Sequence, residues 1–401
     1  MSLDGRVLID LFCDGGAVFQ ARVQPARAVV LGPIVTDRSA AEAIAAVASL
    51  FSVCGMAQAA AGVEAVEAAL GIDTDLPTET ARRLLVLAET LREHLVRIGL
   101  DVQRLTDAAP EAALLRRAMT LPVRLRKALF PDGDPFEPGA RAGVPGSDAD
   151  RIAAEAAELT CAMVHVEAGR LCEMNAAAFA AWASDRGTAA ARLAYPILAR
   201  GWAMIGCPKA KGEGVKLQAL ADTTCLARQA GEPLVRAFLS AEGEGGLGAR
   251  LVARFVEAAK LPGEISAGLA VLRGSGTHSC GLRGEGAPKD RMGGSENTEA
   301  WHSSSPASRR LLPAHGEPNA FSGIGYAEAA RGRLEHRVVL CEGRVVGYAV
   351  DAPTSSHFGE NGIAERSLAA LAAPSRAELA LQADLLVRAI DPCVGYQVRF
   401  H

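Results

Sequence analysis

Two thiols near opposite ends of the chain stand in surroundings that suit metal binding. Cys54 lies in the run Ser-Val-Cys-Gly-Met-Ala, and Cys393 lies in the run Asp-Pro-Cys-Val-Gly-Tyr; each follows a helical segment. Thiolate is the preferred protein ligand of soft metals, so two such groups brought together could hold iron, nickel or zinc. Without further support, each cysteine is better explained as a small buried apolar residue.

The other cysteines give no sign of a known thiol site. The chain has nine cysteines, an odd number, and they are widely scattered with no Cys-x-x-Cys pair. This pattern argues against a zinc ribbon, a thioredoxin-type site and a disulfide scaffold. We expect reduced thiols in a cytoplasmic protein.

Composition excludes several broad classes of protein. Among 401 residues, 42 Lys and Arg stand against 46 Asp and Glu, and 49% of the residues are hydrophobic. A net charge of −4 does not suit a nucleic-acid binder that relies on bulk electrostatics, and the apolar content excludes global disorder. The start carries Asp4 where a secretory peptide would carry basic residues, and no apolar run is long enough for a membrane span.

The elements that must position the two thiols are mostly helical. A hairpin is predicted over 7–23, with its turn at Asp-Gly-Gly. The capping box that begins at Ser39 starts a helix over 40–50, which leads to Cys54. Pro77 opens a long helix that carries His94, expected to be a packing residue. Further Ala-rich helices are predicted over 111–128, 148–183, 188–205, 213–240 and 247–260.

The second half ends with a hairpin and a helix. The hairpin is predicted over 337–350, and a capping box that begins at Ser375 starts a helix that stops at Asp391-Pro392, just before Cys393. A Gly/Ser/Pro-rich stretch, 273–319, is predicted as a long irregular insertion. We therefore predict a single α+β, mostly α, domain over 1–401, with β-hairpins near both termini.

The two cysteine runs resemble the metal-binding motifs of NiFe hydrogenase large subunits. Those motifs read Arg-x-Cys-Gly-x-Cys-x-x-x-His near the N-terminus and Asp-Pro-Cys-x-x-Cys-x-x-His at the C-terminus. Residues 91–95, Leu-Arg-Glu-His-Leu, resemble the family's histidine-containing helix, and 325–336 is similar to its Gly-x-x-Glu-Ala-Pro-Arg-Gly-x-Leu-x-His segment. The resemblance covers 1–100 and 320–401, and it implies the large-subunit fold.

The departures from the family pattern change the expected function. Ala57 and Tyr396 stand where the family has the two thiolates that bridge nickel and iron, so two of four thiolates are missing. Ser52 replaces the motif arginine and Ala61 the motif histidine. Arg399 replaces the histidine that in the family helps to hold a magnesium ion. We therefore expect no hydrogen turnover, no nickel and no enzyme activity.

This combination resembles the HupK/HoxV-type hydrogenase accessory proteins, which are maturation factors related to the large subunit. The resemblance implies a scaffold or carrier for the Fe(CN)2(CO) part of the cofactor, with the hydrogenase large subunit and small assembly chaperones as partners. Cys54 and Cys393 are then the expected iron ligands. Glu328 and Arg331 are expected nearby, with the glutamate buried and the arginine over the metal.

Two alternatives remain open at this stage. The chain could be a divergent NiFe hydrogenase large subunit with H2 oxidoreductase activity, or a metal-free interaction protein with inert cysteines. Glu328 and Arg331 could also form a purely structural ion pair. The metal hypothesis makes one geometric prediction: the sulfurs of Cys54 and Cys393 converge in one pocket that Arg331 faces.

Overall fold

The computed structural model describes residues 5–26, 31–107, 109, 111–165, 168–208, 222–240, 244–276 and 320–401. The strands are β1 (Val7–Asp14), β2 (Ala17–Gln24), β3 (Ala320–Ala329), β4 (Gly332–Cys341), β5 (Arg344–Asp351) and β6 (Tyr396–Phe400). The helices are α1 (Gly32–Val35), α2 (Ala40–Leu50), α3 (Gly55–Leu70), α4 (Leu76–Leu105), α5 (Ala112–Leu129), α6 (Ser147–Met163), α7 (Ala168–Glu173), α8 (Ala176–Asp185), α9 (Ala189–Ala199), α10 (Cys225–Gln229), α11 (Pro233–Arg236), α12 (Leu247–Gly276), α14 (Pro353–His357), α15 (Ile363–Leu368) and α16 (Arg376–Ile390). The short 3-10 turns are η1 (Ser52–Cys54) and η2 (Trp202–Met204).

The predicted hairpin at the N-terminal end is confirmed as β1 and β2. The two strands pair antiparallel, and Gly15 and Gly16 supply the positive φ angles that the turn requires. The strand β6 adds to this hairpin on the other side, because it pairs with β1 in parallel and gives the sheet order β2-β1-β6. Segments from the two ends of the chain therefore share one sheet.

The second sheet contains the predicted hairpin over 337–350 and one more strand. Its order is β3-β4-β5, with both pairs antiparallel. The family-like segment over 325–336 forms the end of β3, a tight turn and the start of β4. The turn places Ala330 and Arg331 at one end of the sheet, a position that the sequence alone did not predict.

The helix α3 lies directly against β3. A Cβ added at Gly323 would lie 2.1 Å from the carbonyl oxygen of Ala65, and one added at Gly325 would lie 2.2 Å from that of Ala61. Only glycine permits this approach of strand and helix backbones. The contact fixes the distance between α3, which begins next to Cys54, and the sheet.

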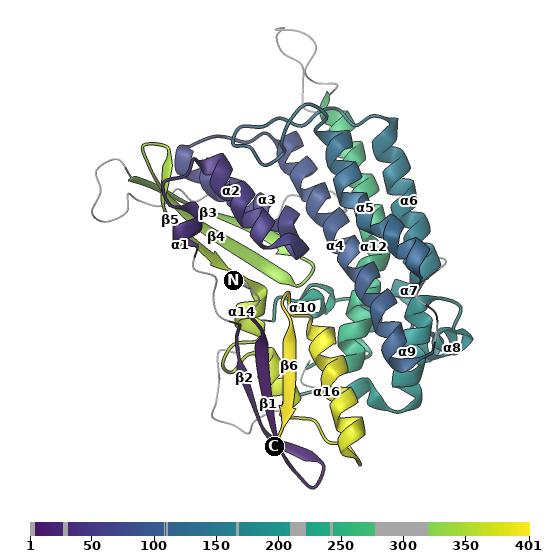
Figure 1. Ribbon diagram of the computed structural model, residues 1–401. Coiled ribbons are helices and arrows are strands. Elements are labelled where there is room, and N and C mark those ends of the chain that lie inside the picture. The colour runs from purple at the N-terminus through teal and green to yellow at the C-terminus, as the bar shows by residue number, and fades with distance from the viewer. Residues whose placement is uncertain are drawn as a thin grey trace, which may run out of the picture.

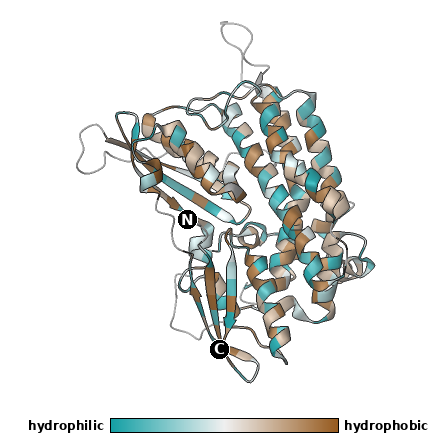
Figure 2. Cartoon of the chain, in the orientation of Figure 1, coloured by the Kyte–Doolittle hydropathy of each residue, from teal (hydrophilic) through white to brown (hydrophobic). Residues whose placement is uncertain are grey.

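Long helices pack side by side to form most of the core. Figure 1 shows α4, α5, α6 and α12 as neighbours, with the two small sheets along one side of them. In Figure 2, hydrophilic and hydrophobic residues alternate along these helices. On α4 an apolar stripe with spacings of three and four is buried, including Leu84, Leu91, Leu95 and Ile98. The mostly helical α+β class is therefore confirmed.

Helix boundaries differ from the prediction mainly in three places. The helix predicted over 148–183 is divided into α6, α7 and α8, and the described part of 213–240 contains only the short helices α10 and α11. The third place is α12. The helix was expected over 247–260, but it runs through Pro262 to Gly276, because a proline removes only one hydrogen bond from a helix that is otherwise well buried. Residues 273–276 thus belong to α12 and not to an irregular insertion; the rest of the predicted insertion, 277–319, lies outside the described residues. Within the described part of the chain, none of the helices combines the length and apolarity that crossing a membrane requires.

Candidate metal-binding site

Cys54 is held at the start of α3. The residue is 8% exposed and closes the η1 turn, in which its backbone N–H donates to the carbonyl of Phe51 at 3.0 Å. Gly55 follows at a close approach, since an added Cβ would lie 3.1 Å from the carbonyl oxygen of Ala48. The chain therefore turns sharply into α3 directly after the thiol.

A buried carboxylate from α4 fixes the first turn of α3. Glu89 accepts the backbone N–H groups of Met56 and Ala57, both at 3.0 Å. These are donors that a helix leaves unpaired at its N-terminus. Burial raises the pKa of Glu89 to about 7, although both N–H groups and Arg92 favour its charged form. Glu89 thus ties α4 to the segment that carries Cys54.

Cys393 follows a turn that three arginines hold in place. α16 ends at Ile390, and Asp391 caps it with a left-handed backbone, φ 68°. Its buried carboxylate lies 2.8 Å from Arg97, 3.5 Å from Arg331 and 3.8 Å from Arg254. Burial raises the pKa of Asp391, but the arginines outweigh burial and lower it overall, so this carboxylate is charged. The ion pairs fix the chain two residues before Cys393.

Arg331 reaches the same region from the turn between β3 and β4. Its side chain is 7% exposed, and its Nη1 donates to Glu93 at 3.0 Å. The next residue, Gly332, has φ 136°, and a Cβ there would lie 2.4 Å from Thr223 Oγ1. Burial lowers the pKa of Arg331, but the carboxylates of Asp391 and Glu93 raise it by more. A charged guanidinium is therefore held beside the thiols.

These segments meet around one small cavity. Its lining residues are Cys54, Gln58, Ala329, Arg331, Leu334, Ala352, Pro353, Thr354 and Cys393. The cavity volume is about 10 Å³, close to the room that one water molecule needs. The predicted convergence of Cys54 and Cys393 beside Arg331 is confirmed as a matter of geometry. Their role as metal ligands stays a prediction.

Each sulfur has its own hydrogen-bond donor. Gln58, one helical turn after Cys54, donates its side-chain amide to Cys54 Sγ at 3.6 Å. The hydroxyl of Thr354 donates to Cys393 Sγ at 3.1 Å and accepts the backbone N–H of the same cysteine at 3.1 Å. Donors to sulfur favour the thiolate that binds a metal. Gln58 was not predicted as a site residue, because its only signal in the sequence is its spacing of four from Cys54.

The protonation state of Cys54 follows from its surroundings. Burial raises its pKa to about 12, and the nearby Cys393 and Glu89 act in the same direction. Gln58 and Arg331 oppose the rise but do not outweigh it. At neutral pH Cys54 is a protonated thiol, so a metal that binds its sulfur must displace that proton.

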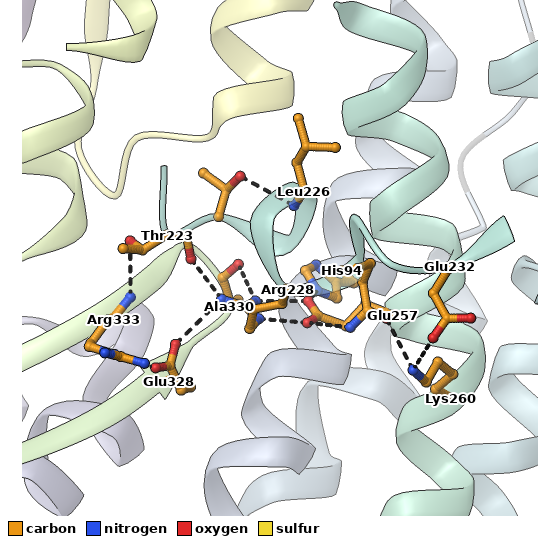
Figure 3. A network of polar contacts seen from close by, with 12 residues as sticks. His94, Thr223, Leu226, Arg228, Glu232, Glu257, Lys260, Glu328, Ala330 and Arg333 are labelled. Atoms are coloured by element: carbon orange, nitrogen blue, oxygen red, sulfur yellow. Dashed lines mark hydrogen bonds and ion pairs between the residues drawn. The ribbon is translucent and has the colours of Figure 1, made fainter. Parts of the chain in front are cut away.

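Glu328 does not lie at this cavity, and the expectation that it is buried there is wrong. Its side chain is 42% exposed and pairs with Arg333 at 2.5 Å, with Arg228 at 3.8 Å as a second partner (Figure 3). Alternate residues of a strand face opposite sides. Because Gly325 faces α3, Glu328 faces the other side of the sheet.

His94 belongs to a buried polar network outside the cavity. Its Nε2 lies 2.6 Å from Glu257, which also accepts Arg228 through two nitrogens at 2.7 and 2.8 Å (Figure 3). Burial lowers the pKa of His94, while Arg228 and the histidine outweigh burial at Glu257 and lower its pKa. The network joins α4, α10 and α12. This placement agrees with the expectation of a packing histidine.

The positions of the missing family ligands are occupied by other contacts. Among the described residues, the cavity walls include neither Ala57 nor Tyr396. The Tyr396 hydroxyl donates to Asp384 at 2.5 Å. Arg399 donates through two nitrogens to the carboxylate of Asp10, at 2.8 and 2.7 Å. Two thiols are therefore the sulfur ligands that this cavity offers.

The chain is similar over its whole length to one hydrogenase accessory protein. No family model matches the chain. It is 29% identical over 420 aligned residues to the "Hydrogenase expression/formation protein HupK" of Bradyrhizobium diazoefficiens, covering 100% of this chain and 98% of that protein. It is 40% identical over 80 residues to the "Hydrogenase expression/formation protein HupV" of Azotobacter chroococcum, which covers only 23% of that protein.

Solved structures share the fold. A chain of the Ni-Fe-Se hydrogenase from D. vulgaris Hildenborough matches with a TM-score of 0.59 at 16% identity, covering 95% of this chain and 94% of that one. The Ni-Fe-Se hydrogenase from Desulfomicrobium baculatum matches with a TM-score of 0.60 at 14% identity, covering 96% and 95%. The predicted hydrogenase large-subunit-like fold and the predicted resemblance to HupK-type accessory proteins are both confirmed.

Proposed function

We propose that this protein is a hydrogenase maturation factor that carries the Fe(CN)2(CO) unit as cargo between Cys54 and Cys393. The observation that carries the proposal is the cavity itself, in which thiols from opposite ends of the chain lie beside a buried guanidinium. The full-length similarity to an expression/formation protein supports a role in maturation. The hydrogenase large subunit and small assembly chaperones are the proposed partners.

The donor set around the cavity suits this cargo. Two soft thiolates are good ligands for low-spin iron. Cyanide ligands are anionic hydrogen-bond acceptors, and Arg331 offers a charged planar donor at the same cavity. Because the carboxylates of Asp391 and Glu93 hold the guanidinium, its orientation is fixed before the cargo arrives.

Binding the cargo requires the site to open. The cavity has room for about one water molecule, whereas an iron with three diatomic ligands is larger. Cys54 must also lose its proton. Both requirements weaken the hold on the iron compared with a preformed four-thiolate site, which suits a carrier that must release what it binds.

Infrared spectroscopy tests the proposal. The protein is produced in cells that make the iron unit and is purified without oxygen. We expect bands of iron-bound CO and cyanide, together with about one iron per chain. Both should be lost in Cys54→Ala and in Cys393→Ala. Cys161→Ala is the matched control, because Cys161 lines a different cavity, and it should keep the bands.

The same samples decide between the alternatives. Stoichiometric nickel together with hydrogen uptake would favour a divergent hydrogenase and would overturn the carrier role. Absence of both metal and diatomic bands, in protein that circular dichroism shows to be folded, would favour a metal-free interaction protein. Bands that persist in both cysteine variants would place the cargo elsewhere on the chain.

A further inference from the structure

A chain of hydrogen bonds leads from Cys54 to the sheet β3-β4-β5. Gln58 Nε2 lies 3.6 Å from Cys54 Sγ, and Gln58 Oε1 lies 2.8 Å from His336 Nε2. His336 Nδ1 lies 2.9 Å from the hydroxyl of Tyr348. The three partners come from α3, β4 and β5, so the chain links the helix that starts at Cys54 to two neighbouring strands.

A glycine on α3 leaves the space that this chain of hydrogen bonds needs. A Cβ added at Gly62 would lie 2.8 Å from the Tyr348 hydroxyl and 3.5 Å from His336 Nδ1. Gln58 is 1% exposed and His336 is fully buried, so water does not compete for the bond between these two residues. In such dry surroundings each hydrogen bond is stronger and polarises the next.

The direction of this chain of hydrogen bonds follows from the Gln58 amide, whose Nε2 lies at the sulfur and whose Oε1 lies at His336. Burial lowers the pKa of His336 to about 3, so the ring is neutral and carries one N–H. Because Gln58 Oε1 can only accept, the histidine proton lies on Nε2 and points at Gln58 Oε1. Nδ1 is then the acceptor for the hydroxyl of Tyr348.

The second sulfur lacks this kind of support. Thr354, the donor to Cys393, is held through its contacts with Cys393 itself, at the sulfur and at the backbone N–H. Its hydroxyl can rotate about a single bond. The two thiols of the cavity therefore differ, because only Cys54 has a donor whose orientation is fixed from outside the cavity by a described chain of side chains.

We propose that Tyr348 and His336 are positioning residues that hold the Gln58 amide toward Cys54 and thereby reduce electron donation from that sulfur to bound iron. This inference rests on the proposed function, since it concerns the same cavity. A hydrogen bond to a thiolate withdraws charge from sulfur. Iron bound to such a sulfur returns less charge to its diatomic ligands, which raises their stretching frequencies.

Infrared spectra of loaded variants measure this effect. In Tyr348→Phe the CO and cyanide bands should move to lower frequency with unchanged iron content, and in Gln58→Leu they should move further. The matched control is Tyr326→Phe, a half-buried tyrosine on β3 whose side chain does not line the cavity; its bands should stay in place. A merely structural role would change iron content or folding without a directed shift.

A second measurement does not depend on iron. In protein labelled with 15N-histidine, the His336 signal is identified by its loss in His336→Gln. We expect the Nε2–H form in the parent protein and an increased share of Nδ1–H in Tyr348→Phe. The inference would be overturned by a parent protein in the Nδ1–H form, or by unshifted bands in both Tyr348→Phe and Gln58→Leu. Neither result would contradict the proposed carrier role. Absence of iron bands in the parent protein would instead overturn the carrier role, and the tautomer would still decide whether the chain is oriented as inferred.

Discussion

The buried residue His336 makes the stability of the protein depend on pH. His336 is fully buried between two uncharged partners, Gln58 and Tyr348, and burial alone lowers its pKa from 6.5 to about 3. When the pH falls below 6.5, the histidine of the unfolded chain takes up a proton while that of the folded protein does not. The stability that the neutral ring contributes is therefore complete above 6.5 and is lost as the pH falls toward 3.

The size of this loss follows from the two pKa values. Each pKa unit corresponds to about 1.4 kcal/mol, so the complete loss between pH 6.5 and about 3 is about 5 kcal/mol for this group. Between about pH 7 and about pH 5, where the folded protein can be studied, the expected loss of stability from this histidine is about 2 kcal/mol.

Urea unfolding followed by circular dichroism measures the free energy of unfolding at each pH. His336→Gln keeps a neutral hydrogen-bonding side chain but removes the titrating group. Its free energy of unfolding should therefore fall by about 2 kcal/mol less between pH 7 and 5 than that of the parent protein. Tyr348→Phe is the matched control, because it removes one hydroxyl from the same chain and keeps the histidine; its pH slope should match that of the parent. Equal slopes for His336→Gln and the parent would refute the assignment of a neutral buried ring.

Three further changes test the packing that positions the site. Gly325→Ala places a Cβ 2.2 Å from a backbone carbonyl oxygen of α3 and should lower the free energy of unfolding by about 1–3 kcal/mol or more. Gly263→Ala, in open space on α12, is the control and should not lower it. Thermal unfolding compares the two variants. Glu67→Ala leaves buried Arg82 without its partner at 2.7 Å and should cost about 3–5 kcal/mol in urea unfolding. Ser39→Ala removes the capping box of α2 and should cost about 0.5–2 kcal/mol by the same measurement.

Local signals in the sequence predicted many of the elements. The capping box that begins at Ser39 is present with both of its hydrogen bonds, and Ser375 accepts the N–H of Glu378 at the start of α16. The turn at Gly15 and the long helix opened by Pro77 also formed as expected. Each of these features depends on residues within a few positions of one another, and for that reason the pattern is visible without a structure.

The contacts that complete the site are not local and could not be predicted in this way. His336 and Gln58 are separated by 278 positions, and Arg399 and Asp10 by 389. The pairing of β6 with β1 brings the two ends of the chain together, and nothing in either strand alone specifies its partner. The resemblance to hydrogenases placed Arg331 correctly but misplaced Glu328, because strand alternation in β3 decides which side of the sheet a residue faces.

The departures from the hydrogenase pattern form a consistent set when their contacts are compared. Three of the replaced positions have an intramolecular hydrogen-bond partner: Glu89 accepts the backbone N–H of Ala57, Asp384 accepts the hydroxyl of Tyr396, and Asp10 accepts from Arg399. At the cavity itself, by contrast, both thiols remain and each has a donor. The two thiols that remain, each with its own hydrogen-bond donor, are the feature that supports the proposed carrier role.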